Sequence, residues 1–323
     1  MAKKHSKTGK LFTIIFALLI AACLMLTASS YGYLPSGFPS WETVFGKSEQ
    51  AVSAFTNNDK SADNADKSSS VHFIDCGQGD CEAIASNGTL TVIDTGPTKN
   101  ANSTLNYIKS LGFDRIDNLV LTHAHEDHIG GASLLIENFQ IGTIYMSKPK
   151  VGTEPNTEVY RRLLKTISDK GLKITTAKAG MTFDCGAFSM QILSPVKDYD
   201  ELNDQSVVIH AAYDDISFLF TGDAESEPMN AMLGSSYSSL ESTVLKVGHH
   251  GSKTSTTKKW LAAVQPQYAV ISCEQGNSYG HPHGKVLNLL NDANAKIYRT
   301  DINGSVVMTT DGETVKITPE REE

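Results

Sequence analysis

The segment THAHEDHIGG, from Thr122 to Gly131, is the most informative part of this chain. It places three histidines and an aspartate within six positions, although only 10 of the 323 residues are histidines. The mostly apolar segment 117–121 precedes it and predicts a strand. The polar side chains then lie at the carboxyl end of that strand, where open α/β sheets bind their ligands. Imidazoles and carboxylates so close together are typical of a site for zinc, or for manganese or iron.

The side chains of this segment are expected to divide between two ions. His123 and His125 project to the same side, because an extended chain repeats every two residues. Asp127 and His128 then point elsewhere and can bind a second ion nearby. Ordinary surface histidines are the alternative interpretation, and the density of the cluster argues against it.

Further candidate ligands follow other predicted strands. Asp223 ends the sequence FTGD after one strand, and a carboxylate there can bridge two ions. Asp94 follows another strand and can orient a ligand histidine through a hydrogen bond. A single histidine in a loop is usually no ligand, but seven of the ten histidines follow predicted strands, which favours one convergent site. Those outside the central segment are His249, His250, His281 and His283.

Strand-like and helix-like segments alternate from Val71 onward, which predicts an α/β domain. Short runs of branched apolar residues bounded by turn residues indicate the strands. Two such runs around Asp311-Gly312 predict a closing hairpin. The expected strands are 71–74, 90–93, 117–121, 143–146, 207–213, 217–220, 244–247, 268–272, 305–309 and 314–317, and the expected helices are 102–111, 159–170, 258–264 and 286–291.

The N-terminal region predicts export and attachment to a membrane. Four lysines precede the uncharged run from Leu11 to Ala28, a pattern typical of a secretion signal or an anchor. The run has 18 residues, near the lower limit for a bilayer span. An uncleaved anchor in the cell membrane, with the bulk of the chain extracellular, is the favoured interpretation. The alternatives are a secreted chain after cleavage and a lipoprotein modified at Cys23.

A polar stretch separates this region from the rest of the chain. The sequence from Thr56 to Ser70 contains no apolar residue larger than alanine, so it cannot bury enough surface to fold alone. We therefore expect a signal or anchor at 1–30, a linker at 31–70 and a folded domain at 71–323.

The net charge and the cysteine content limit which partners and which disulfide bonds are expected. The net charge of −8 gives no general attraction to nucleic acid, so such a substrate needs a local basic patch or metal ions. Five cysteines are too few for a disulfide scaffold. Cys76 and Cys81 flank a turn, and an exported chain meets oxidising surroundings. Either a disulfide across the turn or two buried thiols is expected.

These motifs resemble those of the metallo-β-lactamase-fold hydrolases. The shared pattern is His-x-His-x-Asp-His, with Asp-Thr-Gly upstream and Thr-Gly-Asp downstream. More narrowly, the chain resembles the C-terminal hydrolase domain of ComEC, a DNA-uptake channel. The resemblance implies an α/β (α+β) fold, a four-layer αβ/βα sandwich with metal ions at the rim between two sheets. The segments that carry it, in order, are 72–80, 121–131, 219–225, 245–255 and 279–283.

The resemblance also implies the ligands of each ion. Many family members have a further histidine about twenty residues before the Gly-Asp pair, where this sequence has Asn203. His210 is nearer, but it lies inside a strand and is expected to be structural. The first site is therefore expected to be one ligand short, with Asn203 as a weak substitute and with one or two Zn²⁺ ions, or Mn²⁺, bound. The first ion would be held by His123, His125 and Asp223, and the second by Asp127, His128, His249 and Asp223.

The role of His281 follows from the same resemblance, and the other catalytic and substrate-binding roles follow from the chemistry of the residues. Asp127, together with His128, would serve the attacking water, whose pKa a metal ion lowers. His281 would bind the substrate phosphate or act as an acid. The loop Ser252-Lys253-Thr254-Ser255 carries hydroxyls and a cation that suit a phosphate, or it caps the helix that follows. Substrate contacts are expected from Ser252, Lys253 and His250.

The function predicted from these features is that of an extracytoplasmic metal-dependent hydrolase, a phosphodiesterase or nuclease. Its substrate would be DNA or a phosphodiester polymer of the cell envelope. The channel's many membrane spans have no counterpart in this sequence, so DNA import is not implied. One alternative is hydrolysis of a lactone, thioester or β-lactam on the same fold. Another is a non-catalytic surface binding protein. No protein partner is indicated.

Overall fold

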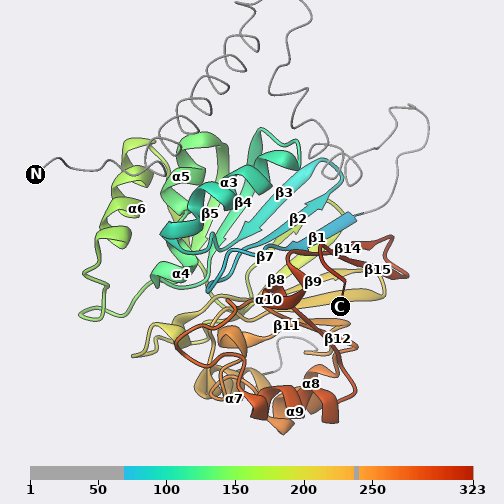
Figure 1. Ribbon diagram of the computed structural model, residues 1–323. Helices are drawn as coiled ribbons and strands as arrows, with labels where there is room; N and C mark the ends of the chain where they lie inside the picture. The colour runs from blue at the N-terminus through green and yellow to red at the C-terminus, as the bar shows by residue number, and fades with distance from the viewer. Residues whose placement is uncertain (1–68, 236–239, 323) are drawn as a thin grey trace, which may run out of the picture. The chain divides into compact units, whose positions relative to one another are not determined.

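The computed structural model describes residues 69–235 and 240–322. In this part of the chain, two β-sheets pack face to face and helices cover the outer face of each sheet, which gives four layers (Figure 1). None of the helices in this part is long and apolar enough to cross a bilayer. The expected anchor at 1–30 and nearly all of the expected linker lie outside the described residues.

The first sheet contains eight strands and is parallel on one side only. Strands β3 to β6 run parallel to one another, whereas the remaining neighbours pair antiparallel. In sheet order the strands are β15 (Val315–Pro319), β14 (Val306–Thr310), β1 (Ser69–Phe73), β2 (Glu82–Ser86), β3 (Thr89–Ile93), β4 (Arg115–Leu121), β5 (Gln140–Met146) and β6 (Ile174–Thr176).

The second sheet contains seven strands and has the same division. Strands β10 to β13 are parallel, and β7 to β10 pair antiparallel. One half of each sheet therefore consists of parallel strands, and loops follow the carboxyl ends of these strands. In sheet order the strands are β13 (Lys296–Arg299), β12 (Tyr268–Ile271), β11 (Val244–Lys246), β10 (Ile216–Phe220), β9 (Val208–Tyr213), β8 (Phe188–Ser194) and β7 (Thr182–Cys185).

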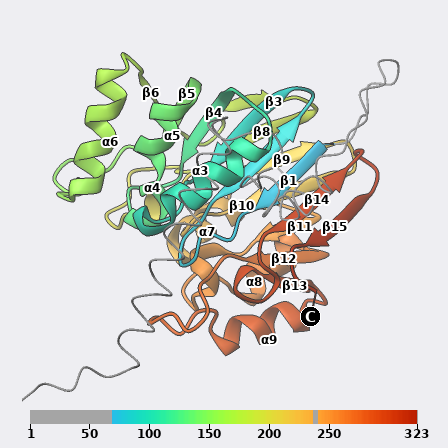
Figure 2. The ribbon, with the colours of Figure 1, turned by 45° about the horizontal axis from the view of Figure 1, so that its top comes forward.

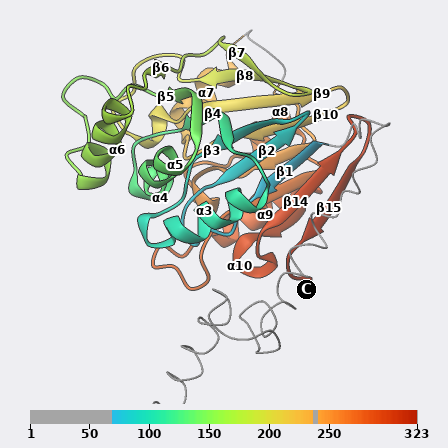
Figure 3. The same ribbon diagram turned by 90° about the horizontal axis from the view of Figure 1, so that it is seen from above.

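The helices form the two outer layers, as the turned views show (Figures 2 and 3). Short helices α4 (Glu126–Ile129) and α10 (Thr300–Asn303) follow β4 and β13. The eight-stranded sheet is covered by α3 (Ala101–Ser110), α5 (Ala132–Asn138) and α6 (Glu158–Asp169), and the seven-stranded sheet by α7 (Ser226–Leu233), α8 (Lys258–Val264) and α9 (Gly284–Asp292).

Alternation along each strand divides the apolar residues among three core layers. Phe218 and Phe220 of β10 face the other sheet, and Phe220 stacks on Phe73 of β1 at a ring-centroid distance of 6.0 Å. Leu219, between them, faces the helices instead. Burying each aromatic ring contributes about 2 kcal/mol. This alternation fixes the register of the strands, because a slip of one residue would move every side chain to the opposite face of the sheet.

The strands and helices predicted from the sequence are confirmed, with ends within three residues of those expected. Strand β1 begins at Ser69, two residues before the expected domain start, and Ser69 Oγ lies 2.7 Å from Ser86 Oγ of β2. Elements that the sequence analysis did not predict are β2, β6, β7, β8, β13, α4, α5, α7 and α10.

Cys76 and Cys81 are two free, buried thiols, so the alternative of a disulfide is wrong. The Cys76 side chain packs onto Gly96, where an added Cβ would lie only 2.9 Å from Sγ. Burial raises the pKa of both thiols well above its ordinary value. Both residues therefore serve as small core residues in the turn that joins β1 to β2.

Candidate metal centre

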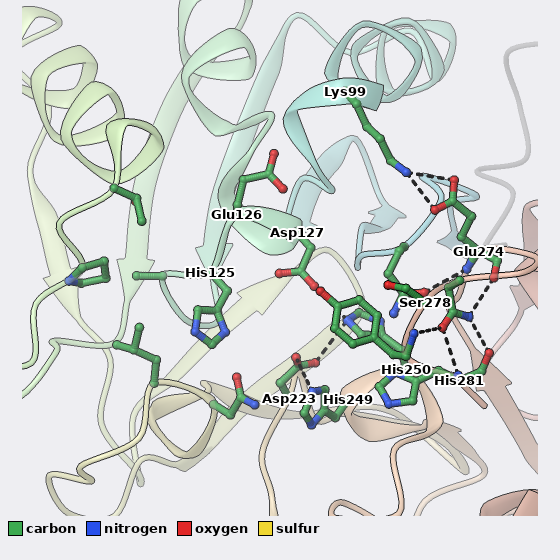
Figure 4. Close-up of a pocket in the computed structure, with 18 residues that line it drawn as sticks. Lys99, His125, Glu126, Asp127, Asp223, His249, His250, Glu274, Ser278 and His281 are labelled. Carbon is green, nitrogen blue, oxygen red and sulfur yellow. Dashed lines mark hydrogen bonds and ion pairs between the residues drawn. The ribbon is translucent and has the colours of Figure 1, made fainter. Parts of the chain in front are cut away.

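The loops at the carboxyl ends of the parallel strands of both sheets meet around one polar cavity of about 750 Å³ (Figure 4). Strand β4 supplies the segment from His123 to His128, β10 supplies Asp223, and β11 supplies His249 and His250. The cavity wall includes Gln78, Lys99, His125, Glu126, Asp127, Asn203, Asp223, His249, His250, Glu274, Asn277, Tyr279 and His281.

Asp94 holds the loop that begins with Thr122. Its buried carboxylate accepts hydrogen bonds from Thr122 N at 2.8 Å and from Thr122 Oγ1 at 2.6 Å. His128 Nδ1 lies 2.7 Å from the Asp94 carboxylate, and because a carboxylate only accepts, Nδ1 carries the proton. The Nε2 atom of His128 is therefore free to bind a cation. Asp94 thus contacts His128 through the ring nitrogen that faces away from the cavity.

Four ligand atoms converge on one point in the cavity. One atom each of Asp127, His128, Asp223 and His250 lies within 4.8 Å of all the others. His250 Nε2 is 3.3 Å from Asp127 Oδ2, and His128 Nε2 is 3.3 Å from Asp223 Oδ1. His128 Nε2, His250 Nε2 and Asp223 Oδ1 are buried without a hydrogen-bond partner. Buried polar atoms in this state are rare unless a missing group satisfies them, so these residues fit a divalent cation.

The structure corrects the predicted place of one ligand. The sequence analysis assigned His249 to the group of Asp127 and His128, and His250 to the substrate. Instead, His250 is the histidine that joins that group. The reason is the backbone, since His249, His250 and Gly251 are all left-handed, with φ of 51°, 52° and 82°. Such backbone strain in residues other than glycine is found mainly at functional sites. Here the left-handed backbone directs the His250 side chain toward the cavity.

A second set of donors surrounds the other oxygen of Asp223. Asp223 Oδ2 is 3.9 Å from His123 Nε2 and 3.7 Å from His249 Nε2. His123 Nε2 also lies 3.0 Å from His125 Nδ1. Asp223 therefore stands between the two groups, as expected of a bridging carboxylate. Asn203 lines the cavity, and its buried Oδ1 has no hydrogen-bond partner.

Burial and neighbouring charges oppose each other in the pKa values of this centre. Burial raises the pKa of Asp127, but the positive charges of His128 and His250 outweigh it and hold the pKa at about 2. Burial lowers the pKa of His250, whereas the carboxylates of Asp223 and Asp80 raise it to about 10. The cluster therefore attracts positive charge, as a cation site must.

The loop from Ser252 to Ser255 does not form the predicted substrate surface. Neither Ser252 nor Lys253 belongs to the cavity wall. Ser252 is buried, with its Oγ 3.0 Å from Thr254 Oγ1, and Lys253 is exposed. Thr254 Oγ1 lies 3.4 Å from His249 Nδ1, so the hydroxyls of this loop support the histidine loop. The cap of helix α8 is made by Thr257 Oγ1, which accepts from Trp260 N at 3.1 Å.

His281 does line the cavity, opposite the segment after β4. Asn277 holds its backbone, because Asn277 Oδ1 accepts from His281 N at 3.0 Å and Nδ2 donates to His281 O at 2.6 Å. Burial, followed by the charges of His249 and His250, lowers the pKa of His281 to about 4. A neutral imidazole can donate one N–H to an oxygen, and both roles predicted for this residue stay predictions.

Asp80 and Lys246 are site residues for which the sequence analysis predicted no role. Asp80 Oδ2 is 2.7 Å from Lys246 Nζ, and Asp80 Oδ1 is 3.2 Å from His250 Nδ1. A signal was present in the sequence, because Lys246 interrupts an otherwise apolar strand. A lysine buried in a strand requires a carboxylate partner, and the Gly-Gln-Gly-Asp turn offered one.

A two-sheet fold that gathers imidazoles and carboxylates at the carboxyl ends of its parallel strands defines a metal-binding protein of mixed α/β class. The chain belongs to the metallo-β-lactamase superfamily, whose family model matches residues 74–275. Members of this superfamily are in general metal-dependent hydrolases. The fold predicted from the motifs is thereby confirmed.

Curated relatives confirm the narrower resemblance to ComEC-type competence proteins. ComE operon protein 3 of Bacillus subtilis (strain 168) is 32% identical over 255 residues, an alignment that covers 73% of this chain and 32% of that protein. Competence protein ComA of Neisseria gonorrhoeae is 30% identical over 237 residues, covering 73% of this chain and 31% of the relative. The chain thus spans about a third of the length of these relatives.

Solved structures support the fold alone. CmlA, a diiron β-hydroxylase from Streptomyces venezuelae, matches with a TM-score of 0.50 at 12% identity, covering 76% of this chain and 55% of CmlA. The metallo-β-lactamase fold protein YhfI from Bacillus subtilis matches with a TM-score of 0.50 at 10% identity, covering 75% of this chain and all of YhfI. At such identities the two structures say nothing about substrate.

Proposed function

We propose that this chain is an extracytoplasmic metal-dependent phosphodiesterase. The observation that carries the proposal is the convergence of Asp127, His128, Asp223 and His250, three of whose buried ligand atoms lack a partner, on an open polar cavity. A cation held there would be exposed to substrate on the cavity side. A purely structural metal site, by contrast, is closed on all sides by protein ligands.

The donor chemistry suits Zn²⁺ or Mn²⁺. One ion would be held by Asp127, His128, His250 and Asp223, and a further ion by His123, His125 and His249 with the other oxygen of Asp223. When bound, such ions lower the pKa of a coordinated water and neutralise negative charge on a phosphoryl oxygen. Imidazole and carboxylate donors do not select between the two metals by themselves.

The residues of the cavity would each contribute to hydrolysis. The low pKa of Asp127 keeps its carboxylate ionised, so it can accept a hydrogen bond from the attacking water and orient it. His281, held by Asn277 on the opposite side, can donate one N–H to a substrate oxygen. The cavity is open to solvent, so the end of a polymer can reach the site as well as a small ester.

The class of substrate is inferred from the relatives. The competence proteins that match this chain at 30 to 32% identity align with it over about a third of their own length. A phosphodiester of DNA, or of a cell-envelope polymer, is the substrate that this relationship favours. Because the net charge is −8, the ions themselves would supply the positive charge that attracts a phosphate.

The extracytoplasmic location is part of the proposal and rests on the N-terminal sequence. Four lysines followed by the uncharged run from Leu11 to Ala28 favour a membrane anchor with the rest of the chain outside. Protease treatment of intact cells that make the protein would test this. Degradation of the domain without lysis supports the proposed side, and protection until lysis contradicts it.

The activity is tested with the purified full-length chain. Its metal content would be measured first, and hydrolysis of bis-p-nitrophenyl phosphate, single-stranded DNA and nitrocefin would be followed with Zn²⁺ or Mn²⁺ added. We expect turnover of the phosphodiesters and none of nitrocefin. Asp127→Ala and His128→Ala variants should fold but lose this activity. Hydrolysis of nitrocefin alone would favour the lactam-opening alternative, and binding of less than one ion per chain would favour a non-catalytic binding protein.

A further inference from the structure

An ion pair between Asp80 and Lys246 lies beneath the candidate metal centre. The two side chains are each 1% exposed, and the Asp80 Oδ2 to Lys246 Nζ distance is 2.7 Å. Asp80 belongs to the loop between β1 and β2 of the eight-stranded sheet, whereas Lys246 is the last residue of β11 in the seven-stranded sheet. The pair therefore connects the two sheets at the edge where the ligand loops emerge.

Stability alone is a poor explanation for this pair. Desolvation of two buried charges commonly costs as much as their attraction returns, and apolar residues of similar volume often stabilise such a position better. Lys246 Nζ also donates a hydrogen bond to the carbonyl oxygen of Val247 at 3.2 Å. A charged pair at this place is more readily explained by what Asp80 contacts.

Asp80 contacts both loops that carry the convergent ligands. Its Oδ1 lies 3.2 Å from His250 Nδ1, whose proton is directed to the Ser272 carbonyl oxygen at 3.0 Å. Its backbone N–H donates to the Asp127 carbonyl oxygen at 3.2 Å. One residue thus contacts a ligand loop from each sheet, and Lys246 holds its carboxylate in place.

We propose that Asp80 and Lys246 form a positioning pair that sets the spacing between Asp127 and His250 for cation binding. The inference rests on the proposed metal centre, but it concerns residues outside the ligand set. The Asp80 carboxylate also lies beside the Nδ1–H of His250, which makes Nε2 a better donor to a cation. Removal of such an outer partner typically weakens metal binding about 10–100-fold.

The test replaces the pair by an apolar pair in the full-length chain. Asp80→Leu/Lys246→Met removes both buried charges of the pair together, so it is the variant most compatible with folding. Asp80→Asn is the second variant, which keeps the shape of the side chain and removes its charge. For each protein, the stoichiometry and affinity for Mn²⁺ would be measured by calorimetry, and the visible spectrum of the Co²⁺ form would be recorded.

A matched control comes from the far end of a strand that leads to the site. Arg115 Nε and Asp117 Oδ1 form an ion pair at 2.8 Å at the start of β4, whereas the ligand histidines follow its other end. Arg115→Met/Asp117→Asn should therefore bind Mn²⁺ as the parent does. Circular dichroism and thermal unfolding would confirm that all variants are folded.

The expected result is Mn²⁺ affinity about 10–100-fold lower in both Asp80 variants, with an altered Co²⁺ spectrum and unchanged secondary structure. Parent-like affinity and spectrum in either folded Asp80 variant would overturn the positioning role. If the parent itself binds no ion, the proposed function fails as well, and the two failures are thus distinguishable.

Discussion

Asp223 is the residue on which both groups of ligands depend. Its Oδ1 faces His128 at 3.3 Å and its Oδ2 faces His249 at 3.7 Å, so one carboxylate serves both sides of the cavity. The backbone of Asp223 is held in place, because its N–H donates a hydrogen bond to Ser206 Oγ at 3.1 Å. At the scale of single residues, the site therefore depends on which ring nitrogen of each histidine faces this carboxylate and is free to bind a cation.

Replacement of the two neighbouring histidines should have unequal effects. In His250→Ala we expect a loss of ion affinity larger than the roughly 10–100-fold seen when an outer partner is removed, because His250 Nε2 lies in the convergent group. His249→Ala should lose less, since its side chain is 23% exposed and partly engaged by Glu225. Calorimetric titration with Mn²⁺ measures both.

His210→Gln is the control for these variants, because His210 lies inside β9 and its Nε2 donates to the Glu241 carbonyl oxygen, away from the cavity wall. It should bind ions as the parent does. A greater loss in His249→Ala than in His250→Ala would show that the sequence-based assignment of these two ligands was right after all.

Asp94→Ala should destabilise the ion-free protein. The change leaves Thr122 N, Thr122 Oγ1 and His128 Nδ1 buried without their acceptor. At about 1–3 kcal/mol for each unsatisfied group, the loss is about 3 kcal/mol or more in the free energy of unfolding. Urea unfolding with a chelator present measures it.

Asp311→Ala is the matched control for Asp94→Ala. Asp311 Oδ1 also accepts from three donors, Glu313 N, Thr314 N and Thr314 Oγ1, but on an exposed hairpin turn. Water can replace an exposed acceptor, so the loss there should stay below about 1 kcal/mol. Equal losses in the two variants would contradict the argument from burial.

The loops after the strands, rather than the strands themselves, position the site at the scale of elements. The loop from β1 to β2 packs against the loop that carries Asp127, and Gly79 is at their closest approach. A Cβ on Gly79 would lie 2.3 Å from the Asp127 carbonyl oxygen and 2.8 Å from Pro97 Cδ. Only a residue without a side chain allows the two loops to meet.

Gly79→Ala should therefore displace the Asp127 loop and weaken Mn²⁺ binding at least about 10-fold, as loss of an outer partner does. Gly88→Ala is the control, because Gly88 also has a positive φ but an added Cβ meets nothing within 4 Å. That variant should lose only about 1–2 kcal/mol of stability from backbone strain and keep its ion affinity. Equal affinities in folded samples of both variants would refute the packing argument.

Several of the strands that the sequence did not predict are short or poor in branched apolar residues. Strand β6 has three residues and β7 has four, too few for a periodic pattern. Strand β2 reads EAIAS, with two alanines and a buried glutamate. Such strands are stabilised by their neighbours in the sheet, because β propensity depends on cross-strand packing.

At the scale of the whole molecule, the candidate site spans both sheets. Asp127 and His128 follow the eight-stranded sheet, whereas Asp223 and His250 follow the seven-stranded one. A cation bound by all four would therefore link the two halves of the sandwich. Ion binding and global stability are coupled in such an arrangement.

Saturating Mn²⁺ or Zn²⁺ should raise the unfolding temperature of the full-length chain. An ion present at about 100 times its Kd stabilises the folded state by about 2.7 kcal/mol, which corresponds to a shift of roughly 5–10 °C for a domain of this size. Scanning calorimetry with ion and then with chelator measures the shift and its reversal. The His250→Ala variant should show much less of it, and an equal shift in that variant would contradict a link through His250.

The sequence by itself determined the superfamily, the order of most strands and helices, and the cluster from His123 to His128. Those features are local, because hydrophobic periodicity and motif spacing are written along the chain. Only the tertiary structure decided that His250 rather than His249 joins Asp127, and that Asp80 pairs with Lys246, 166 residues away. These outcomes depend on left-handed backbone angles and on the meeting of two sheets, which neither propensity nor spacing specifies.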